Sequence, residues 1–195
     1  MHWAGDRSEN MTRTMLSDID IRELDRDLQI LLATNGTLTR ILKIIADDEI
    51  VVEIINQQIH PTAPEIPDLE RLPDSRILQR QTILKGLSSG EEFIAAEALI
   101  AMDLLPTAIL RKLTETDHPI GELMVASCLE VFKETAEIWE GELPDWLVST
   151  SERKSPAHAI ARRYHMIVDG QSVIVLTEHF LPGIFRGHTM RNWAS

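Results

Sequence analysis

The last quarter of the chain contains the stretch AIARRYHMIVDGQSVIVLTEHFL, residues 159–181. Two runs rich in β-branched and aromatic residues, 159–168 and 172–181, flank Asp169 and Gly170. An Asp-Gly pair between such runs is typical of the two-residue turn of a β-hairpin. The stretch therefore predicts two adjacent antiparallel strands near the end of the fold.

Two more hairpins are predicted upstream. Residues 38–45 and 49–59 are rich in Ile and Val, and a short polar turn joins them. Residues 76–85 and 93–102 form the other pair, around a Gly-containing turn. Three hairpins imply an antiparallel sheet of about six strands, a usual size.

Helices are predicted before and between these hairpins. Ser17 with Asp20 three residues later resembles a capping box, and the apolar spacing that follows predicts one amphipathic helix within residues 17–35. Pro106 is expected to begin a short helix over residues 107–113. The predicted fold class is therefore α+β, a single antiparallel sheet with helices on one face.

The composition fits one domain. The chain has 195 residues, a net charge of −12 and 44% hydrophobic residues. A single core typically serves about 100–200 residues. We expect one domain over residues 17–186, between a flexible tail at 1–16 and a C-terminal tail at 187–195.

Several classes of partner are disfavoured. The acidic balance opposes nucleic-acid binding, which needs clustered Lys and Arg. No run reaches the roughly 18 apolar residues of a spanning helix, and the polar N-terminus is unlike a signal peptide, so we expect a cytoplasmic protein without a membrane partner. The histidines lack metal-site spacing, so no metal is expected. Cys128 is the one cysteine; it excludes an internal disulfide and is expected to be structural.

Strand alternation places an acid in an apolar row. Ile174, Leu176, Glu178 and Phe180 share one face of the last predicted strand, because residues two apart point the same way. Burial disfavours the charged form of a carboxyl group. Glu178 therefore needs a nearby cation or hydrogen-bond donors.

The strand at residues 76–85 has a matching feature. Arg80 shares a face with Leu78, Thr82 and Leu84. A buried guanidinium needs a carboxylate, from the protein or from a ligand. Two interpretations remain open: Arg80 and Glu178 pair with each other structurally, or they bind a ligand.

Other polar residues give weaker signals. Glu97 lies on the apolar face of its predicted strand, which suggests a third inward acid that supports the site. Arg162 and Arg163 are interpreted as part of a solvated edge rather than as a substrate clamp. His179 should face away from Glu178, so the two are not expected to form an acid–base pair.

Four motifs occur in a characteristic order along residues 17–185. They are NGTLTR (35–40), RILQR (76–80), PIG (119–121) and VLTEHFLP (175–182). In this order they resemble the chorismate pyruvate-lyase family, most closely its mycobacterial 4-hydroxybenzoate synthase branch.

The resemblance implies a fold and an activity. The fold is a six-stranded antiparallel sheet whose helices and loops enclose a buried ligand pocket. It makes residues 129–139 a strand, although the apolar spacing there favours a helix. The activity is cleavage of chorismate into 4-hydroxybenzoate and pyruvate without a cofactor, with the product feeding phenolic glycolipids or a quinone.

The resemblance also implies roles for four residues. By motif position, Arg80 holds the ring carboxylate and Glu178 lies beside the C4 hydroxyl. Leu38 and Ile120 line the substrate pocket. Glu178 is expected either to handle a proton in the elimination or only to position the ring.

Two alternatives to an enzyme are considered. One is a non-catalytic domain of the same fold that senses a small aromatic carboxylate. Such domains normally follow a DNA-binding helix-turn-helix, whereas only a short segment precedes Ser17, so the enzyme is favoured. The other is a structural module closed by an Arg80–Glu178 salt bridge.

Overall fold

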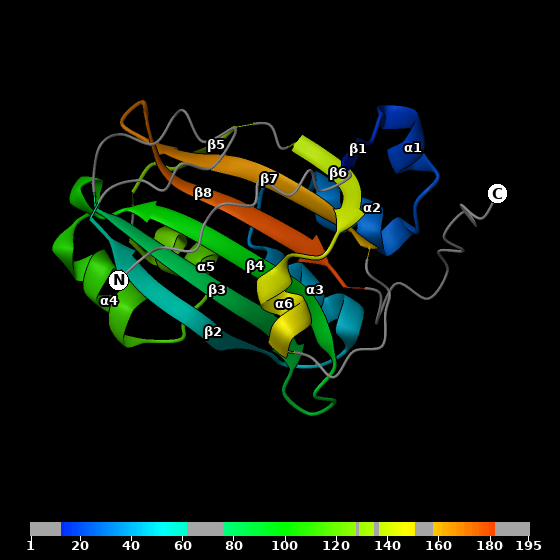
Figure 1. The fold of residues 1–195 in the computed structure, drawn as a ribbon, viewed down its shortest axis with the longest axis horizontal. Helices are drawn as coiled ribbons and strands as arrows, with labels where there is room; N and C mark the ends of the chain where they lie inside the picture. The colour runs from blue at the N-terminus through cyan, green and yellow to red at the C-terminus, as the bar shows by residue number, and fades with distance from the viewer. Residues whose placement is uncertain (1–12, 62–75, 128, 135–136, 151–157, 182–195) are drawn as a thin grey trace.

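The computed structural model shows an α+β protein with one antiparallel sheet (Figure 1). It describes residues 13–61, 76–127, 129–134, 137–150 and 158–181. Within these ranges the strands are β1 (Arg13–Met15), β2 (Ile50–His60), β3 (Ile77–Gly86), β4 (Glu92–Ala101), β5 (Phe132–Lys133), β6 (Glu137–Glu142), β7 (His158–Val168) and β8 (Gln171–Phe180). Their order is β1-β6-β7-β8-β4-β3-β2, and β5 also pairs with β7. The fold class is confirmed, with eight strands instead of six.

Helices lie on both faces of this sheet. They are α1 (Asp18–Arg22), α2 (Arg26–Ala33), α3 (Leu38–Ala46), α4 (Thr107–Glu115), α5 (Ile120–Ala126) and α6 (Asp145–Thr150), with a 3-10 turn at Met102–Leu104. Figure 1 shows α2, α3 and α5 behind the sheet and α6 in front of it. Leu147 of α6 packs with Ile83 and Ala95, on the opposite face from the clusters around α2–α5. The prediction of helices on one face is therefore wrong for α6.

The local signals that predicted two hairpins and a helix are confirmed. Asp169 and Gly170 have φ values of 50° and 76°, as the tight turn between β7 and β8 requires. β3 and β4 form the second predicted hairpin. The helix after Pro106 is α4, which extends two residues past its predicted end.

One predicted hairpin is wrong in its first half. Residues 38–45 form helix α3, and β2 pairs with β3 instead. Leu38, Leu42 and Ile45 recur at helical spacing and pack on the core, so this periodicity outweighs the β-branched composition. Asp47, in the left-handed region at φ 50°, ends the helix.

The single helix predicted within residues 17–35 is two helices. The capping box is confirmed: Ser17 Oγ accepts from the Asp20 amide at 3.3 Å, and Asp20 Oδ2 accepts from the Ser17 amide at 2.9 Å. Asp25 forms a second N-cap by accepting from the Asp27 amide at 2.9 Å. A second cap marks a second helix start, which the continuous apolar spacing concealed.

The strand prediction for residues 129–139 is confirmed in part: 132–133 form β5 and β6 begins at 137, whereas the described residues 129–131 are neither strand nor helix. β5 and β6 follow one another along the same edge of β7. Pairing with this edge overrides the local periodicity. Within the predicted tail 1–16, residues 13–15 form β1, which pairs with β6. Cys128 lies outside the described residues.

The sheet face covered by α2–α5 carries four rows of paired residues across β3, β4, β8 and β7. The two outer rows are apolar and belong to separate core clusters: Leu78, Ile100, Ile174, Met166 and Leu84, Ile94, Phe180, Ile160. The two inner rows carry the polar groups: Arg80, Ala98, Leu176, Tyr164 and Thr82, Ala96, Glu178, Arg162. A polar band therefore crosses the sheet between two apolar clusters.

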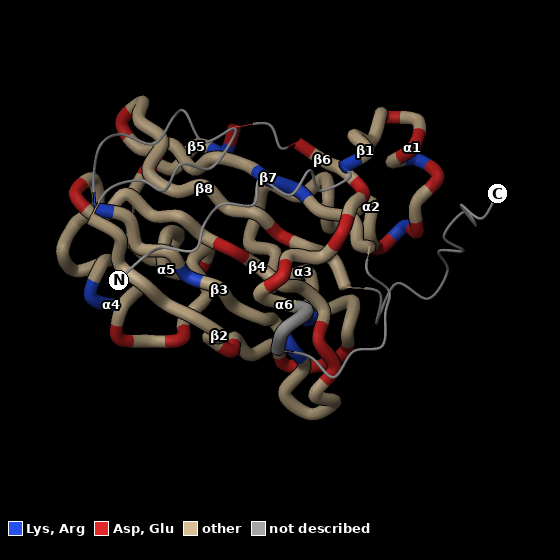
Figure 2. The backbone as a smooth tube through the Cα atoms, viewed as in Figure 1, with Lys and Arg blue, Asp and Glu red and all other residues tan. Residues whose placement is uncertain are grey.

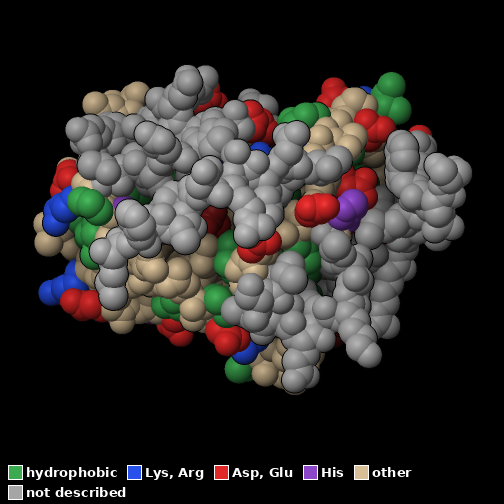
Figure 3. All heavy atoms as spheres, viewed as in Figure 1, with side chains coloured by type: hydrophobic (Ala, Val, Ile, Leu, Met, Phe, Trp, Pro, Cys, Tyr) green, Lys and Arg blue, Asp and Glu red, His purple; other side chains and the backbone are tan. Residues whose placement is uncertain are grey.

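Charges outside this band are dispersed. Figure 2 shows Lys and Arg on several separate elements, and Asp and Glu at strand ends and in turns. On the face shown in Figure 3, acidic side chains are scattered among the described atoms. In the described part of the chain this differs from the clustered basic surface that binds a phosphate backbone.

Candidate active site

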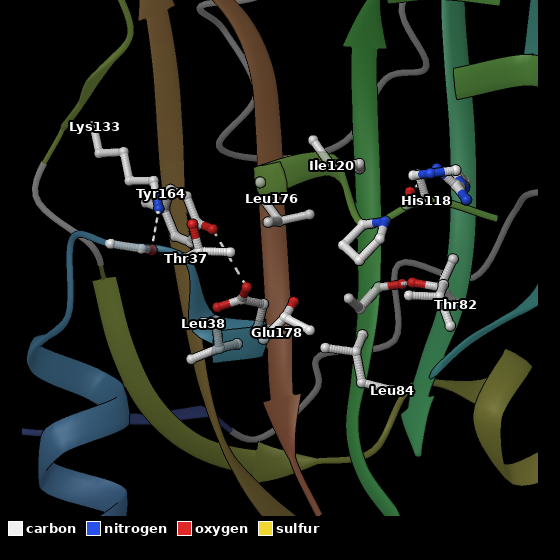
Figure 4. A pocket seen from close by; sticks show the side chains of 17 residues that line it. Thr37, Leu38, Thr82, Leu84, His118, Ile120, Lys133, Tyr164, Leu176 and Glu178 are labelled. Atoms are coloured by element: carbon white, nitrogen blue, oxygen red, sulfur yellow. Dashed lines mark hydrogen bonds between the residues drawn. The ribbon is translucent and has the colours of Figure 1, made fainter. Parts of the chain in front are cut away.

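A cavity lies over the polar band, between the sheet and the starts of α3 and α5 (Figure 4). Its lining residues are Gly36, Thr37, Leu38, Thr39, Val52, Arg80, Thr82, Leu84, Ala96, His118, Pro119, Ile120, Gly121, Lys133, Tyr164, Leu176 and Glu178. All four residues with a predicted role, Arg80, Glu178, Leu38 and Ile120, are among them. The structure therefore brings together residues from four distant parts of the sequence.

Glu178 is held at both of its carboxylate oxygens. Its side chain is buried, and Oε2 accepts from Arg162 Nε at 2.6 Å. Oε1 accepts from the Tyr164 hydroxyl at 3.3 Å, as Figure 4 shows. Charge-assisted bonds of this kind fix the geometry of an acid. The cation that a buried Glu178 needs is thus Arg162, and not Arg80.

Arg162 is not part of a solvated edge, because only 2% of its surface is exposed. Its Nη1 donates to three backbone carbonyls at the C-terminal end of α2, at 2.7–3.2 Å. It therefore joins a helix end to the acid of the cavity. Arg163 points to the opposite face and is also buried, with Nε 3.1 Å from Thr177 Oγ1. The solvated-edge prediction is wrong for both, because β7 lies inside the sheet.

Arg80 has no carboxylate partner in the described part of the chain. It is 1% exposed, and its Nη1 and Nη2 donate to the carbonyls of His118 and Thr116 at 3.1 Å each. Its Nε is buried without an acceptor among these residues. Burial lowers the pKa of the Arg80 guanidinium, and the charge of Asp117 opposes this shift. The structural Arg80–Glu178 salt bridge is therefore not formed, because Glu178 pairs with Arg162.

Two lining residues were missed from the sequence. Burial raises the pKa of the Tyr164 hydroxyl well above its ordinary value, with the charge of Glu178 acting in the same direction. Tyr164 therefore stays protonated and donates to the acid. Lys133 donates from Nζ to the Gly36 carbonyl at 3.0 Å and lies 5.0 Å from the centre of the Tyr164 ring.

Helix α3 begins at the cavity. Leu38 is its first residue, and the N-cap Thr37 makes no side-chain capping bond. The first amide groups of a helix have no acceptors within the helix. The start of α3 therefore offers donors beside the apolar Leu38 side chain.

One acid and one base that the sequence analysis considered, Glu97 and His179, lie away from the cavity. Glu97 is on the opposite face, where it accepts from Gln79 and Gln81 at 2.8 and 2.7 Å. The prediction that it supports the site is wrong, because its face of β4 is not the cavity face. His179 also faces away from Glu178, as predicted, and burial lowers its pKa to about 4.

Two other kinds of site are absent from the described part of the chain. Among the described residues, no three His, Cys, Asp or Glu side chains are grouped so that they could hold a metal ion. No helix in the same residues is long and apolar enough to span a membrane.

The fold is shared with domains of bacterial regulators. A transcriptional regulator of the GntR family from Bacillus cereus superposes with a TM-score of 0.53 at 12% identity, covering 69% of this chain and 93% of that one. The possible transcriptional regulator YydK from Bacillus subtilis gives 0.51 at 13%, covering 69% and 58%. At such identities the likeness concerns the fold alone.

Sequence comparison gives a closer relation. The chorismate pyruvate-lyase of Mycobacterium leprae (strain TN) is 56% identical over 90% of this chain and 84% of its own length. That of Mycobacterium tuberculosis (strain CDC 1551 / Oshkosh) is 51% identical over 90% of each chain. Residues 32–186 match the family described as chorismate pyruvate-lyase Rv2949c-like. The chain therefore belongs to the Rv2949c-like chorismate pyruvate-lyase family.

Proposed function

We propose that the protein is a chorismate lyase, which eliminates pyruvate from chorismate and leaves 4-hydroxybenzoate. The observation that carries this proposal is the buried Arg80, whose guanidinium lacks a carboxylate among the described residues and lines the same cavity as Glu178. Relatives that are more than half identical bear the name of this activity. The reaction is redox-neutral and produces an aromatic ring, so no cofactor is proposed.

Arg80 would bind the ring carboxylate. Its two carbonyl contacts use one N–H on each terminal nitrogen, which leaves further N–H groups and the buried Nε–H for a ligand. A planar guanidinium can donate two parallel bonds to one carboxylate. The carbonyls of Thr116 and His118 therefore fix the fork in the orientation that sets the ring.

The elimination breaks two bonds of chorismate. The hydrogen at C4 leaves as a proton, its electron pair forms the C3–C4 double bond, and the C3–oxygen bond breaks. The ring becomes aromatic, and the released enolpyruvate takes up a proton to become pyruvate. The protein must orient the ring, exclude water and handle one proton.

Glu178 is the group in the cavity that suits this proton. Arg162 holds one of its oxygens, while the other meets the Tyr164 hydroxyl. In one version Glu178 contacts the C4 hydroxyl and takes part in proton transfer. In the other, hydrogen moves within the substrate and Glu178 only positions the ring.

A second candidate function is a non-catalytic domain that binds a small aromatic carboxylate, because the fold resembles that of a bacterial transcriptional regulator. One experiment distinguishes this sensor from the lyase. Purified protein is mixed with chorismate without metal or nucleotide, and 4-hydroxybenzoate is followed by ultraviolet absorbance. Pyruvate is measured in parallel with lactate dehydrogenase. Equal amounts of both products, formed over many turnovers, support the lyase. Tight binding of chorismate without turnover would instead support the sensor.

A further inference from the structure

Chorismate is a dianion, and Arg80 accounts for only one of its carboxylates. Lys133 is a second cation that lines the cavity. We propose that Lys133 binds the carboxylate of the enolpyruvyl group and so holds the leaving group during the elimination. This inference rests on the proposed lyase function.

Lys133 and Arg80 approach the cavity from opposite sides. Lys133 pairs with Met166 of β7, which places it on the cavity face beside Tyr164. Arg80 shares a row with Tyr164 across β3, β4, β8 and β7, three strand spacings apart. At about 4.8 Å per spacing, the backbones of Arg80 and Tyr164 are roughly 14 Å apart. Two long cationic side chains, Arg80 from β3 and Lys133 from β5, therefore line the same cavity as Glu178.

The Lys133 ammonium has spare hydrogen-bonding capacity. It carries three N–H donors, and the contacts of Nζ are the Gly36 carbonyl and the Tyr164 ring face. Among the described residues, no carboxylate lies within ion-pair distance of the Lys133 ammonium. Glu178, the acid of the cavity, pairs with Arg162 instead. Burial lowers the pKa of Lys133, and the charge of Glu178 opposes this. An anion bound at Nζ would offset that desolvation.

A neighbouring cavity gives the enolpyruvyl group room at this position. Its volume is about 380 Å³, and its border with the first cavity is formed by Gly36, Thr37, Gly121 and Lys133. Pockets of this size accommodate small molecules. Under this proposal, the enolpyruvyl group would extend past Lys133 into the neighbouring cavity, and pyruvate would leave through it.

The test compares two ligands that differ in the second carboxylate. 4-Hydroxybenzoate keeps the ring carboxylate but lacks the enolpyruvyl one. We expect Lys133→Met to raise the KM for chorismate by about 10- to 100-fold, because one charged partner is lost. The dissociation constant of 4-hydroxybenzoate, measured by calorimetry, should stay within about twofold.

Three other variants serve as controls. Lys133→Arg should recover most of the chorismate affinity, because the charge is kept. Lys112→Met removes an exposed lysine of α4 that does not line the cavity, and both constants should match wild type. Arg80→Met should weaken both ligands.

Two results would overturn the inference. One is an unchanged KM for chorismate in Lys133→Met. The other is an equal loss of chorismate and 4-hydroxybenzoate binding, which would mean that Lys133 only shapes the cavity through Gly36 and Tyr164. Failure of the wild-type protein to cleave chorismate is a different outcome, because it rejects the lyase itself.

Discussion

Glu178 is a buried acid whose two oxygens have different partners. Oε2 belongs to an ion pair with Arg162, and Oε1 accepts from Tyr164. In Glu178→Gln the shape is kept but the charge and the proton acceptor are lost. If Glu178 takes part in proton transfer, kcat should fall by about 100-fold or more, while 4-hydroxybenzoate affinity changes less. Steady-state kinetics check this, and a kcat within a few-fold of wild type would leave Glu178 a positioning role only.

Arg80 should control the affinity for the ring carboxylate. Arg80→Met is expected to weaken binding of 4-hydroxybenzoate by about 2–4 kcal/mol, because the carboxylate loses its buried charged partner. Arg80→Lys should restore only part of this, since an ammonium lacks the planar fork. Calorimetric titration with 4-hydroxybenzoate measures both. An affinity equal to wild type in Arg80→Met would place the ring carboxylate elsewhere.

At the scale of elements, Arg162 links α2, β7 and β8. It contacts the last carbonyls of α2 and the Glu178 carboxylate from within the sheet. Arg162→Met should lower the free energy of unfolding by about 3–5 kcal/mol, because it leaves a buried acid and helix carbonyls without a donor. Urea unfolding measures this loss.

A double variant tests whether the ion pair causes the loss. In the double variant Arg162→Met with Glu178→Gln, no buried charge is left without a partner, because the amide of Gln is neutral. The double variant should therefore lose less free energy of unfolding than the sum of the losses of the two single variants. Strictly additive losses would mean that Arg162 stabilises mainly through the end of α2.

Strand alternation predicted the central part of the site. It placed Glu178 and Arg80 on the inner face, and the same argument applied to residues 159–168 would have put Arg162 and Tyr164 there too. On β7 they share this face with the apolar Ile160, two residues before Arg162. Because Arg162 and Arg163 are adjacent and both charged, they resemble an exposed pair, although their side chains point to opposite faces of β7.

Other parts of the fold were not accessible to local patterns. Lys133 belongs to a two-residue strand whose position is set by β7, far along the chain. The length of this strand is too short for any period to show. Helix α3 had a clear period, but its Ile-rich composition favoured a strand. Periodicity thus predicts the face of a residue only once its element is known.

At the scale of the whole molecule, the sheet has two buried faces with different polar contents. On the face opposite the cavity, His179 is buried with its ring edge-on to Trp139, at 6.3 Å between ring centres. Burial lowers the pKa of His179 to about 4, and the charges of Arg13 and Arg163 act in the same direction. The folded protein therefore keeps this imidazole neutral at pH values where an unfolded chain protonates it.

This difference makes stability depend on pH. The ordinary pKa of histidine is about 6.5, so between pH 6.5 and 4 the unfolded state binds more protons than the folded state. Above pH 6.5 His179 is neutral in both states and does not lower the free energy of unfolding. As the pH falls below 6.5, its protonation in the unfolded state lowers the free energy of unfolding, by up to about 3 kcal/mol near pH 4. Urea unfolding of the wild type at pH 7.5 and 5.0 measures the loss. His179→Gln cannot protonate, so its stability should fall less over this interval. An equal fall in both proteins would show that other groups, chiefly carboxylates, cause the acid sensitivity.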